Sequence, residues 1–276
     1  MKITQVVPGF VSEFDEVDLR SDTGPDLAKA VLQALGDTPV VVFRGQEIDD
    51  ELQLRFAAML GPLRAVDGRP YIGTAGNVDD DGNLIAEDDQ RQWIAQGSRV
   101  WHTDLSFRRF PDRYTLLSSR VVPSVGGNTQ FCNAYAAYEA LEEADRRTLD
   151  WLVAVHDLRY SRSLIGLGLT PAEQARDYVT PQPLVLEHPQ TGRRSLYLAK
   201  HISEIIGMPT AEARALVDRL LNHAVHAQFV YELEWRAPGV LAIWDNRATM
   251  HRGMPYADTR EPRVMRRCAV ISNGVV

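Results

Sequence analysis

Lysine is scarce in this sequence, and no apolar run is long enough to cross a membrane. Only three lysines occur among thirty basic residues, so arginine carries nearly all of the positive charge. The net charge is −7, which argues against a nucleic-acid partner because such proteins present a basic surface. The N-terminal segment lacks the apolar stretch of a signal peptide, and a membrane span needs roughly 18 apolar residues. We therefore expect a cytoplasmic protein that binds neither nucleic acid nor membranes.

Cysteine is equally rare, which excludes a disulfide framework. Cys132 and Cys268 are the two cysteines, and both lie in strand-like stretches where a small buried thiol is the expected state. Neither is assigned a catalytic role. With 276 residues, 45% of them hydrophobic, the chain can bury a sizeable core. We expect a single domain spanning residues 1–276.

Hydrophobic periodicity predicts a mainly β protein with flanking helices, in a sandwich or jelly roll. The patterns indicate helices at 25–36, 50–61, 134–153 and 210–226, with glycine closing the first two and Thr210 capping the last. Strands are expected at 39–45, 98–107, 114–123, 128–134, 228–235, 239–246 and 263–272. Residues 68–97 are acidic and turn-rich, and we interpret them as a long loop that is either a lid or plain solvated surface.

The stretch VWHTDLSF, residues 100–107, places His102 and Asp104 two positions apart. In a strand this spacing turns both side chains to one face. A histidine followed by an acidic residue at this spacing is expected about once by chance, given 7 histidines and 37 acidic residues in 276. The pair is therefore either part of a metal site or a satisfied polar pair in a core. A non-haem iron site would need a second histidine from a distant strand, and His251, after the strand-and-turn pattern of residues 239–253, is placed to supply it.

Arginines in the last predicted strand, RVMRRCAVIS, add a second signal. Alternation places Arg263 and Arg267 on the same face as apolar residues. A buried guanidinium without an anion is costly. Each of these arginines therefore needs either an anionic ligand or an acidic side chain of the protein.

These motifs resemble a known enzyme family. WHTD, VVPSVGGNTQF, AYEAL, IWDNRATMHRGMPY and RVMRRCAV follow one another as in the taurine and 2,4-dichlorophenoxyacetate dioxygenase family, whose members use Fe(II) and 2-oxoglutarate. The aryloxyacetate branch looks closer than the taurine branch. The resemblance implies a double-stranded β-helix (jelly roll) core and an enzyme that consumes 2-oxoglutarate and O2.

Carried over residue by residue, the resemblance implies His102, Asp104 and His251 as iron ligands and catalytic residues. Arg263, helped by the Thr129 hydroxyl, would bind 2-oxoglutarate. Three further residues would contact the primary substrate: Arg267, Ser98 and Arg69. The spacing from His251 to Arg263 is one residue longer than the family pattern, GGN replaces GGD, and serine stands at position 98 where asparagine is common.

The expected reaction is hydroxylation of a small anionic substrate, an aryloxyacetate-like carboxylic acid, giving a phenol and glyoxylate with succinate and CO2. This would be a step in aromatic compound catabolism, carried out by a homo-oligomer. Three alternatives stay open: the same chemistry on a sulfonate or alkyl sulfate, a non-catalytic jelly-roll protein that binds small acids, and a hydrolytic zinc enzyme.

Overall fold

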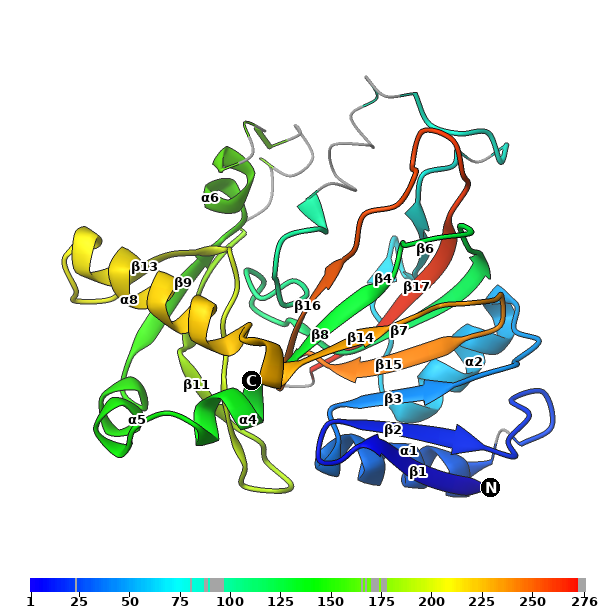
Figure 1. Ribbon diagram of the computed structural model, residues 1–276, viewed down its shortest axis with the longest axis horizontal. Helices are drawn as coiled ribbons and strands as arrows, with labels where there is room; N and C mark the ends of the chain where they lie inside the picture. The colour runs from blue at the N-terminus through cyan, green and yellow to red at the C-terminus, as the bar shows by residue number, and fades with distance from the viewer. Residues whose placement is uncertain are drawn as a thin grey trace.

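A seven-stranded sheet forms the body of the protein. The computed structural model describes residues 1–22, 24–79, 81–86, 89, 97–164, 166, 168–169, 174 and 178–272. The strand order is β1-β2-β3-β15-β7-β17-β6 (Figure 1). Its strands are β1 (Lys2–Val7), β2 (Val11–Asp15), β3 (Val40–Phe43), β15 (Leu241–Asp245), β7 (Asp112–Val121), β17 (Val264–Ile271) and β6 (Ile72–Gly76).

A second sheet of three strands faces the inner side of the first. Its order is β14-β8-β16, formed by β14 (Val230–Leu233), β8 (Thr129–Asn133) and β16 (Thr249–Gly253). Apolar side chains from the two sheets meet in one cluster that includes Met265, Phe131 and Trp244. This arrangement confirms the predicted jelly-roll core.

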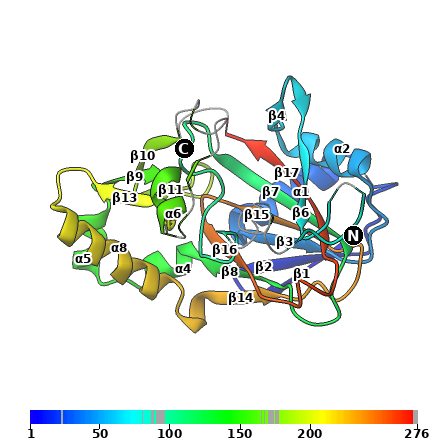
Figure 2. The same ribbon diagram turned by 90° about the horizontal axis from the view of Figure 1, so that it is seen from above.

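Helices cover the outer side of the seven-stranded sheet. Figure 2 shows α1 (Pro25–Asp37) and α2 (Asp50–Leu60) opposite the β14-β8-β16 sheet. Their apolar side chains pack with Cys268 and Val270 of β17 in a separate cluster. Met265 lies in the inner cluster and Cys268 in the outer one, so the predicted alternation along β17 is confirmed.

A third group of elements packs against the outer side of the three-stranded sheet, on the left of Figure 1. The helices are α4 (Ala134–Glu139), α5 (Glu143–Leu149), α6 (Leu158–Ser163), α8 (Thr210–Ala224) and the 3-10 turn η1 (Ala227–Phe229). The strands are β9 (Val153–Asp157), β10 (Val179–Pro183), β11 (Val185–Glu187), β12 (Arg194–Leu196) and β13 (Ile202–Ile205). The remaining strands, β4 (Ala65–Val66) and β5 (Arg69–Pro70), form a small hairpin.

Three predicted helix features were wrong. The helix expected over 134–153 is interrupted after α4, because Leu141 turns into the core at 7% exposure and α5 starts afresh. Thr210 does not cap α8; Pro209 occupies the cap position in an extended conformation, with no side-chain hydrogen bond. Gly36 lies inside α1, whose end is closed by Thr38 through a hydrogen bond to the Ala34 carbonyl. By contrast, α2 does end at a glycine, as predicted.

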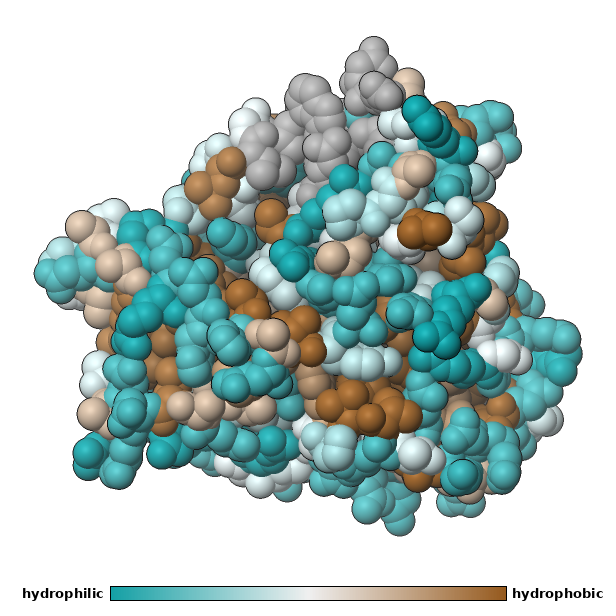
Figure 3. Space-filling model, in the orientation of Figure 1, coloured by the Kyte–Doolittle hydropathy of each residue, from teal (hydrophilic) through white to brown (hydrophobic). Residues whose placement is uncertain are grey.

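Large apolar side chains lie mainly in these buried clusters. On the face drawn in Figure 3, polar residues predominate and apolar ones form small separate patches. Within the described part of the chain, no helix is both long and apolar enough to span a membrane. Both cysteines are free and buried, and burial raises the pKa of Cys132 to about 12 and that of Cys268 to about 11, consistent with inert thiols.

Candidate active site

His102 and His251 are brought together by a single pair of backbone hydrogen bonds. The His102 N–H donates to the His251 carbonyl at 3.1 Å, and the reverse bond is 2.9 Å. The predicted strand over 98–107 was wrong: His102 forms only this isolated bridge, and the residues after Asp104 form turns. Leu105 has a φ of 50°, which a continuous strand does not allow. A turn, not strand alternation, directs Asp104 toward the histidines.

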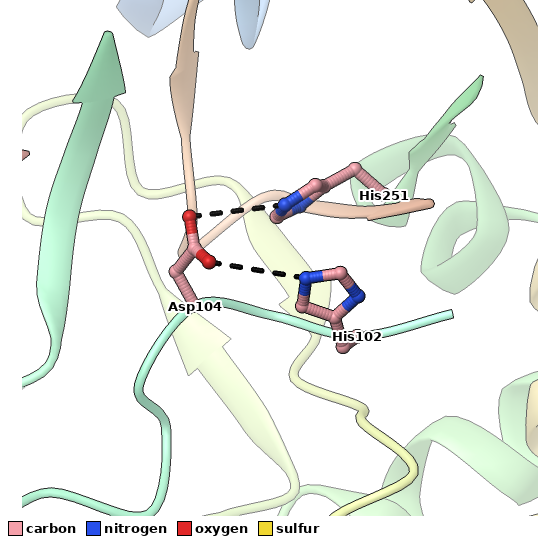
Figure 4. A group of neighbouring side chains, drawn as sticks. All are labelled: His102, Asp104 and His251. Carbon is pink, nitrogen blue, oxygen red and sulfur yellow. Dashed lines mark ion pairs between the residues drawn. The ribbon is translucent and has the colours of Figure 1, made fainter. Parts of the chain in front are cut away.

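The three side chains form one cluster between the sheets (Figure 4). His102 Nε2 lies 3.9 Å from Asp104 Oδ1, and His251 Nε2 lies 3.8 Å from Asp104 Oδ2. One ligand atom from each residue lies within 4.8 Å of the other two. Two imidazole nitrogens and one carboxylate oxygen that occupy one face of a metal's coordination shell are the donor set of the 2-His-1-carboxylate iron enzymes.

The protonation states suit a divalent cation. Burial lowers the pKa of His251 to about 3, so its imidazole is neutral at pH 7. Burial alone would raise the pKa of Asp104, but Arg267 and the two histidines outweigh it and hold the carboxyl ionised. His102 Nδ1 lies 2.8 Å from the Val100 carbonyl, which leaves Nε2 directed at the cluster. His251 Nδ1 is buried without a hydrogen-bond partner. The donor set therefore fits a metal ion.

A shell of polar groups fixes the Asp104 carboxylate and was not predicted from the sequence. Thr115 donates its hydroxyl hydrogen to Asp104 Oδ2 at 2.7 Å. Asn246 accepts the Asp104 backbone N–H at 3.3 Å and donates to Thr115 at 2.9 Å. Thr115 lies on β7 and Asn246 follows β15, so three distant segments converge here. Periodicity marked Thr115 only as an alternating polar residue of a strand.

A second buried network holds the turn before His251. Arg247 pairs with Asp245 and contacts His188 at 2.8 Å. The Thr249 hydroxyl donates to the Asp245 carbonyl at 2.8 Å. The three ionisable side chains are less than 9% exposed, and the Arg247 guanidinium helps to hold the pKa of Asp245 well below its ordinary value against the effect of burial. This network fixes the start of β16 and hence the position of the His251 ring.

The two inward arginines of the last strand meet different surroundings. Arg267 NH2 lies 3.0 Å from Asp104 Oδ2 and 2.7 Å from Asp112 Oδ2. The anion that Arg267 requires is therefore present within the protein, which was the alternative left open by the sequence. Its guanidinium forms part of the support of Asp104.

Arg263 has no such partner. Its Nε donates to the Gly127 carbonyl at 3.0 Å and NH1 to the Ala75 carbonyl at 3.3 Å. Among the described residues, no carboxylate forms an ion pair with it, and burial lowers its pKa to about 10. An interior cation that only neutral carbonyls solvate is a site for an anionic ligand.

Thr129 lies on the strand that continues from the glycines beside Arg263. Its hydroxyl oxygen accepts the Trp235 Nε1–H at 3.1 Å, which leaves the Thr129 hydrogen available to a ligand. Gly127 has a φ of 67°, and a Cβ there would come within 3.3 Å of Arg263 Nε. Glycine therefore lets the backbone approach the guanidinium.

A cavity of about 370 Å³ opens beside His102. Ser98 lies in its wall, and so do two cations that the sequence did not single out, Arg162 and Lys200; the substrate contact of Ser98 stays a prediction. Lys200 lies in the turn between β12 and β13, far in sequence from the metal motifs.

Residues 68–97 are only partly a loop. β6 forms the edge of the main sheet beside β17, so the beginning of this segment is ordered strand. Arg69 is exposed on β5, in a hairpin that projects beside α2 in Figure 2. The interpretation of this segment as a lid stays a prediction, and residues 80, 87–88 and 90–96 of it lie outside the described part of the chain.

Comparison with known proteins agrees with this architecture. Residues 2–269 match the family described as "Taurine catabolism dioxygenase TauD, TfdA family". The chain is 36% identical to the alpha-ketoglutarate-dependent 2,4-dichlorophenoxyacetate dioxygenase of Cupriavidus pinatubonensis, over 98% of this chain and 97% of that protein. It is 34% identical to the alpha-ketoglutarate-dependent sulfate ester dioxygenase of Pseudomonas putida, over 93% and 84%.

A solved structure is similar over nearly the whole chain. The crystal structure of AAD-2 in complex with Mn(II) and N-oxalylglycine superposes with a TM-score of 0.93 and 37% identity, covering 99% of both chains. The family match, the relatives and this structure agree with the His-Asp-His cluster and the jelly-roll core. The chain belongs to the TauD, TfdA family and is an Fe(II)- and 2-oxoglutarate-dependent dioxygenase.

Proposed function

We propose that this enzyme hydroxylates a small aryloxyacetate-like carboxylic acid, giving a phenol and glyoxylate together with succinate and CO2. The names of two relatives refer to 2,4-dichlorophenoxyacetate and to (S)-phenoxypropionate. The cavity beside His102 supports the proposal, because apolar side chains and two cations share its wall. An aromatic acid has the complementary distribution of apolar surface and charge.

His102, Asp104 and His251 hold the iron in this proposal. The neutral His251 ring and the ionised Asp104 supply the lone pairs that a divalent metal needs. Bound iron supplies the oxidative chemistry with O2 and 2-oxoglutarate, whereas the protein supplies binding and orientation. Thr115 and Arg267 keep the Asp104 carboxylate oriented and charged, as a metal ligand would require.

Arg263 and Thr129 bind the distal carboxylate of 2-oxoglutarate. The observation that carries this assignment is the buried Arg263 guanidinium without a protein anion. A planar guanidinium offers two parallel donors to a carboxylate, and the spare Thr129 hydrogen adds a third. The ligand would thereby neutralise a charge that has no carboxylate partner among the described residues.

Residues 1–276 act as one catalytic domain in this proposal. Cytoplasmic location, homo-oligomerisation and substrate contacts from Ser98, Arg69 and Arg267 stay predictions. Of these residues, Ser98 has support from its place in the cavity wall, and Arg267 has the competing contacts to Asp104 and Asp112. Size-exclusion chromatography with light scattering tests the oligomeric state.

A sulfate ester is the second candidate substrate, because a relative of 34% identity is named for it. Succinate formation from 2-oxoglutarate, measured separately with phenoxyacetate, hexyl sulfate and taurine, distinguishes the candidates. We expect phenoxyacetate to stimulate succinate formation most, with phenol released in equal amount. Stimulation by hexyl sulfate alone, with release of sulfate, would transfer the assignment to the sulfate ester class.

A further inference from the structure

The primary substrate needs a cation close to the metal. In an aryloxyacetate the carbon that reacts is bonded directly to the carboxylate carbon. A group that holds the carboxylate therefore also fixes the reacting C–H bond. Arg267, the candidate from the sequence, already pairs with Asp104 and Asp112. A substrate carboxylate would have to compete with both of these buried anions for its guanidinium.

Lys200 is an exposed residue in the wall of the cavity that His102 also lines. Its backbone N–H donates to the Trp101 carbonyl at 3.4 Å, and Trp101 immediately precedes His102. Both His102 and Lys200 line the 370 Å³ cavity. The flexible four-carbon stem of a lysine lets the ammonium move over the cavity while its backbone stays next to the site.

Charge in this cavity is of one sign. Among the described residues of its wall none is acidic, and Lys200 and Arg162 are both cationic. Lys200 forms no ion pair with any described residue. His201 adds a polar but uncharged ring, because burial lowers its pKa well below the ordinary value. The Lys200 ammonium, which has no ion-pair partner among the described residues, favours an anionic ligand.

The rest of the wall is suited to an apolar body. Val100, Leu158 and Leu164 line the same cavity, so a ring placed against them would leave water while its carboxylate stayed near Lys200. Such a division between apolar lining and a few polar anchors is typical of small-molecule sites.

We propose that Lys200 binds the carboxylate of the primary substrate and so selects acids whose reacting carbon is adjacent to the anion. This inference rests on the proposed function. It transfers the substrate anion from Arg267 to Lys200 and leaves Arg267 as a positioning residue for Asp104.

The test compares Lys200→Met with Lys200→Arg. Lys29→Met serves as the matched control, because Lys29 is an exposed lysine on α1. Binding of phenoxyacetate to the Mn(II)-loaded protein in the presence of N-oxalylglycine is measured by calorimetry, together with that of its neutral methyl ester. We expect Lys200→Met to weaken phenoxyacetate binding by about tenfold or more. Lys200→Arg should stay within about threefold, and ester binding and 2-oxoglutarate affinity should not change.

Equal losses for acid and ester in Lys200→Met would indicate a structural role and overturn the inference, as would wild-type affinity. Failure of the proposed function has a different signature. If hexyl sulfate rather than phenoxyacetate binds and is turned over by the wild type, the aryloxyacetate proposal fails. Lys200→Met must then weaken hexyl sulfate binding to a similar extent for the inference to stand. Absence of binding of both anions to the wild type would overturn it as well.

Discussion

The two ends of the segment from Arg263 to Arg267, which leads into β17, have opposite electrostatic surroundings. At one end Arg267 lies between two carboxylates, and this pairing raises its pKa although burial alone would lower it. At the other end the Arg263 guanidinium donates to two backbone carbonyls and has no carboxylate partner among the described residues, and burial lowers its pKa to about 10. The comparison teaches that one extended segment can supply a structural charge and a ligand-binding charge four residues apart.

Removal of Asp104 should have the largest effect, because it takes away a proposed iron ligand and one partner of Arg267. We expect Asp104→Ala to lower 2-oxoglutarate turnover by about a thousandfold or more, the equivalent of several kcal/mol of metal-based stabilisation. Calorimetric titration with Mn(II) should show lost metal binding. Asp15→Ala, an exposed change on β2, is the control. Full activity of Asp104→Ala would exclude the proposed metal site.

The same substitution at the two arginines should separate their roles. Arg267→Met leaves Asp104 and Asp112 without a shared cation, so we expect the free energy of unfolding to fall by about 3–5 kcal/mol. Arg263→Met removes a cation that has no anionic partner among the described residues. This change should alter the free energy of unfolding by about 1 kcal/mol or less. Urea denaturation of the metal-free proteins measures both. Equal losses in the two variants would break the comparison.

His156 extends the comparison to a buried base without a charged partner. Its Nδ1 lies 2.8 Å from Ser106 Oγ, Nε2 has no partner, and burial lowers its pKa to about 3. Between pH 6.5 and 3, His156 is protonated in the unfolded chain but neutral in the folded one. The free energy of unfolding therefore falls as the pH is lowered. From pH 7.5 to 5 this amounts to about 2 kcal/mol.

Between pH 7.5 and 5, the free energy of unfolding of His156→Gln should therefore fall by about 2 kcal/mol less than that of the wild type. Urea denaturation at both pH values measures this difference. His226→Gln, at an exposed position after α8, is the control and should keep the wild-type pH dependence. An identical pH dependence in His156→Gln would mean that His156 is protonated in the folded state.

Among these changes, substitution of Thr129, which lies near Arg263, should have the smallest effect. Thr129→Val keeps the shape of the side chain but removes the spare hydroxyl hydrogen, and one neutral hydrogen bond contributes about 0.5–1.5 kcal/mol. We expect the Kd for 2-oxoglutarate to rise by about two- to tenfold, measured by calorimetry. Thr148→Val, at a surface position of α5, is the matched control. An unchanged Kd would remove Thr129 from the site.

The sequence predicted the parts of the site that depend on local periodicity. Alternation placed Arg263 and Arg267 on the inner face of β17, and the strand pattern located His251. It did not predict the turn at Leu105 that aims Asp104, because a left-handed conformation at leucine leaves no pattern. Nor did it predict the Asp112 partner of Arg267, since that pairing depends on how β7 and β17 are placed side by side.

Long-range packing also determines which residues line the substrate cavity. Lys200 and Arg162 lie between the metal motifs in sequence but outside all of them, and only the docking of the inserted elements brings them to His102. The resemblance therefore indicated Arg267 as the cation for the substrate, because no motif in the sequence marks Lys200 or Arg162.

The central claim is that the unpaired charge of Arg263 binds 2-oxoglutarate. Its most direct test is the calorimetric Kd for 2-oxoglutarate in the Mn(II)-loaded wild type, Arg263→Met and Arg266→Met. Arg266 is the neighbouring arginine on the opposite face of β17, where it pairs with Asp50. We predict that Arg263→Met weakens binding by about ten- to a hundredfold, as expected for a charge-assisted hydrogen bond, and that Arg266→Met stays within about twofold. Wild-type affinity in Arg263→Met would contradict the account.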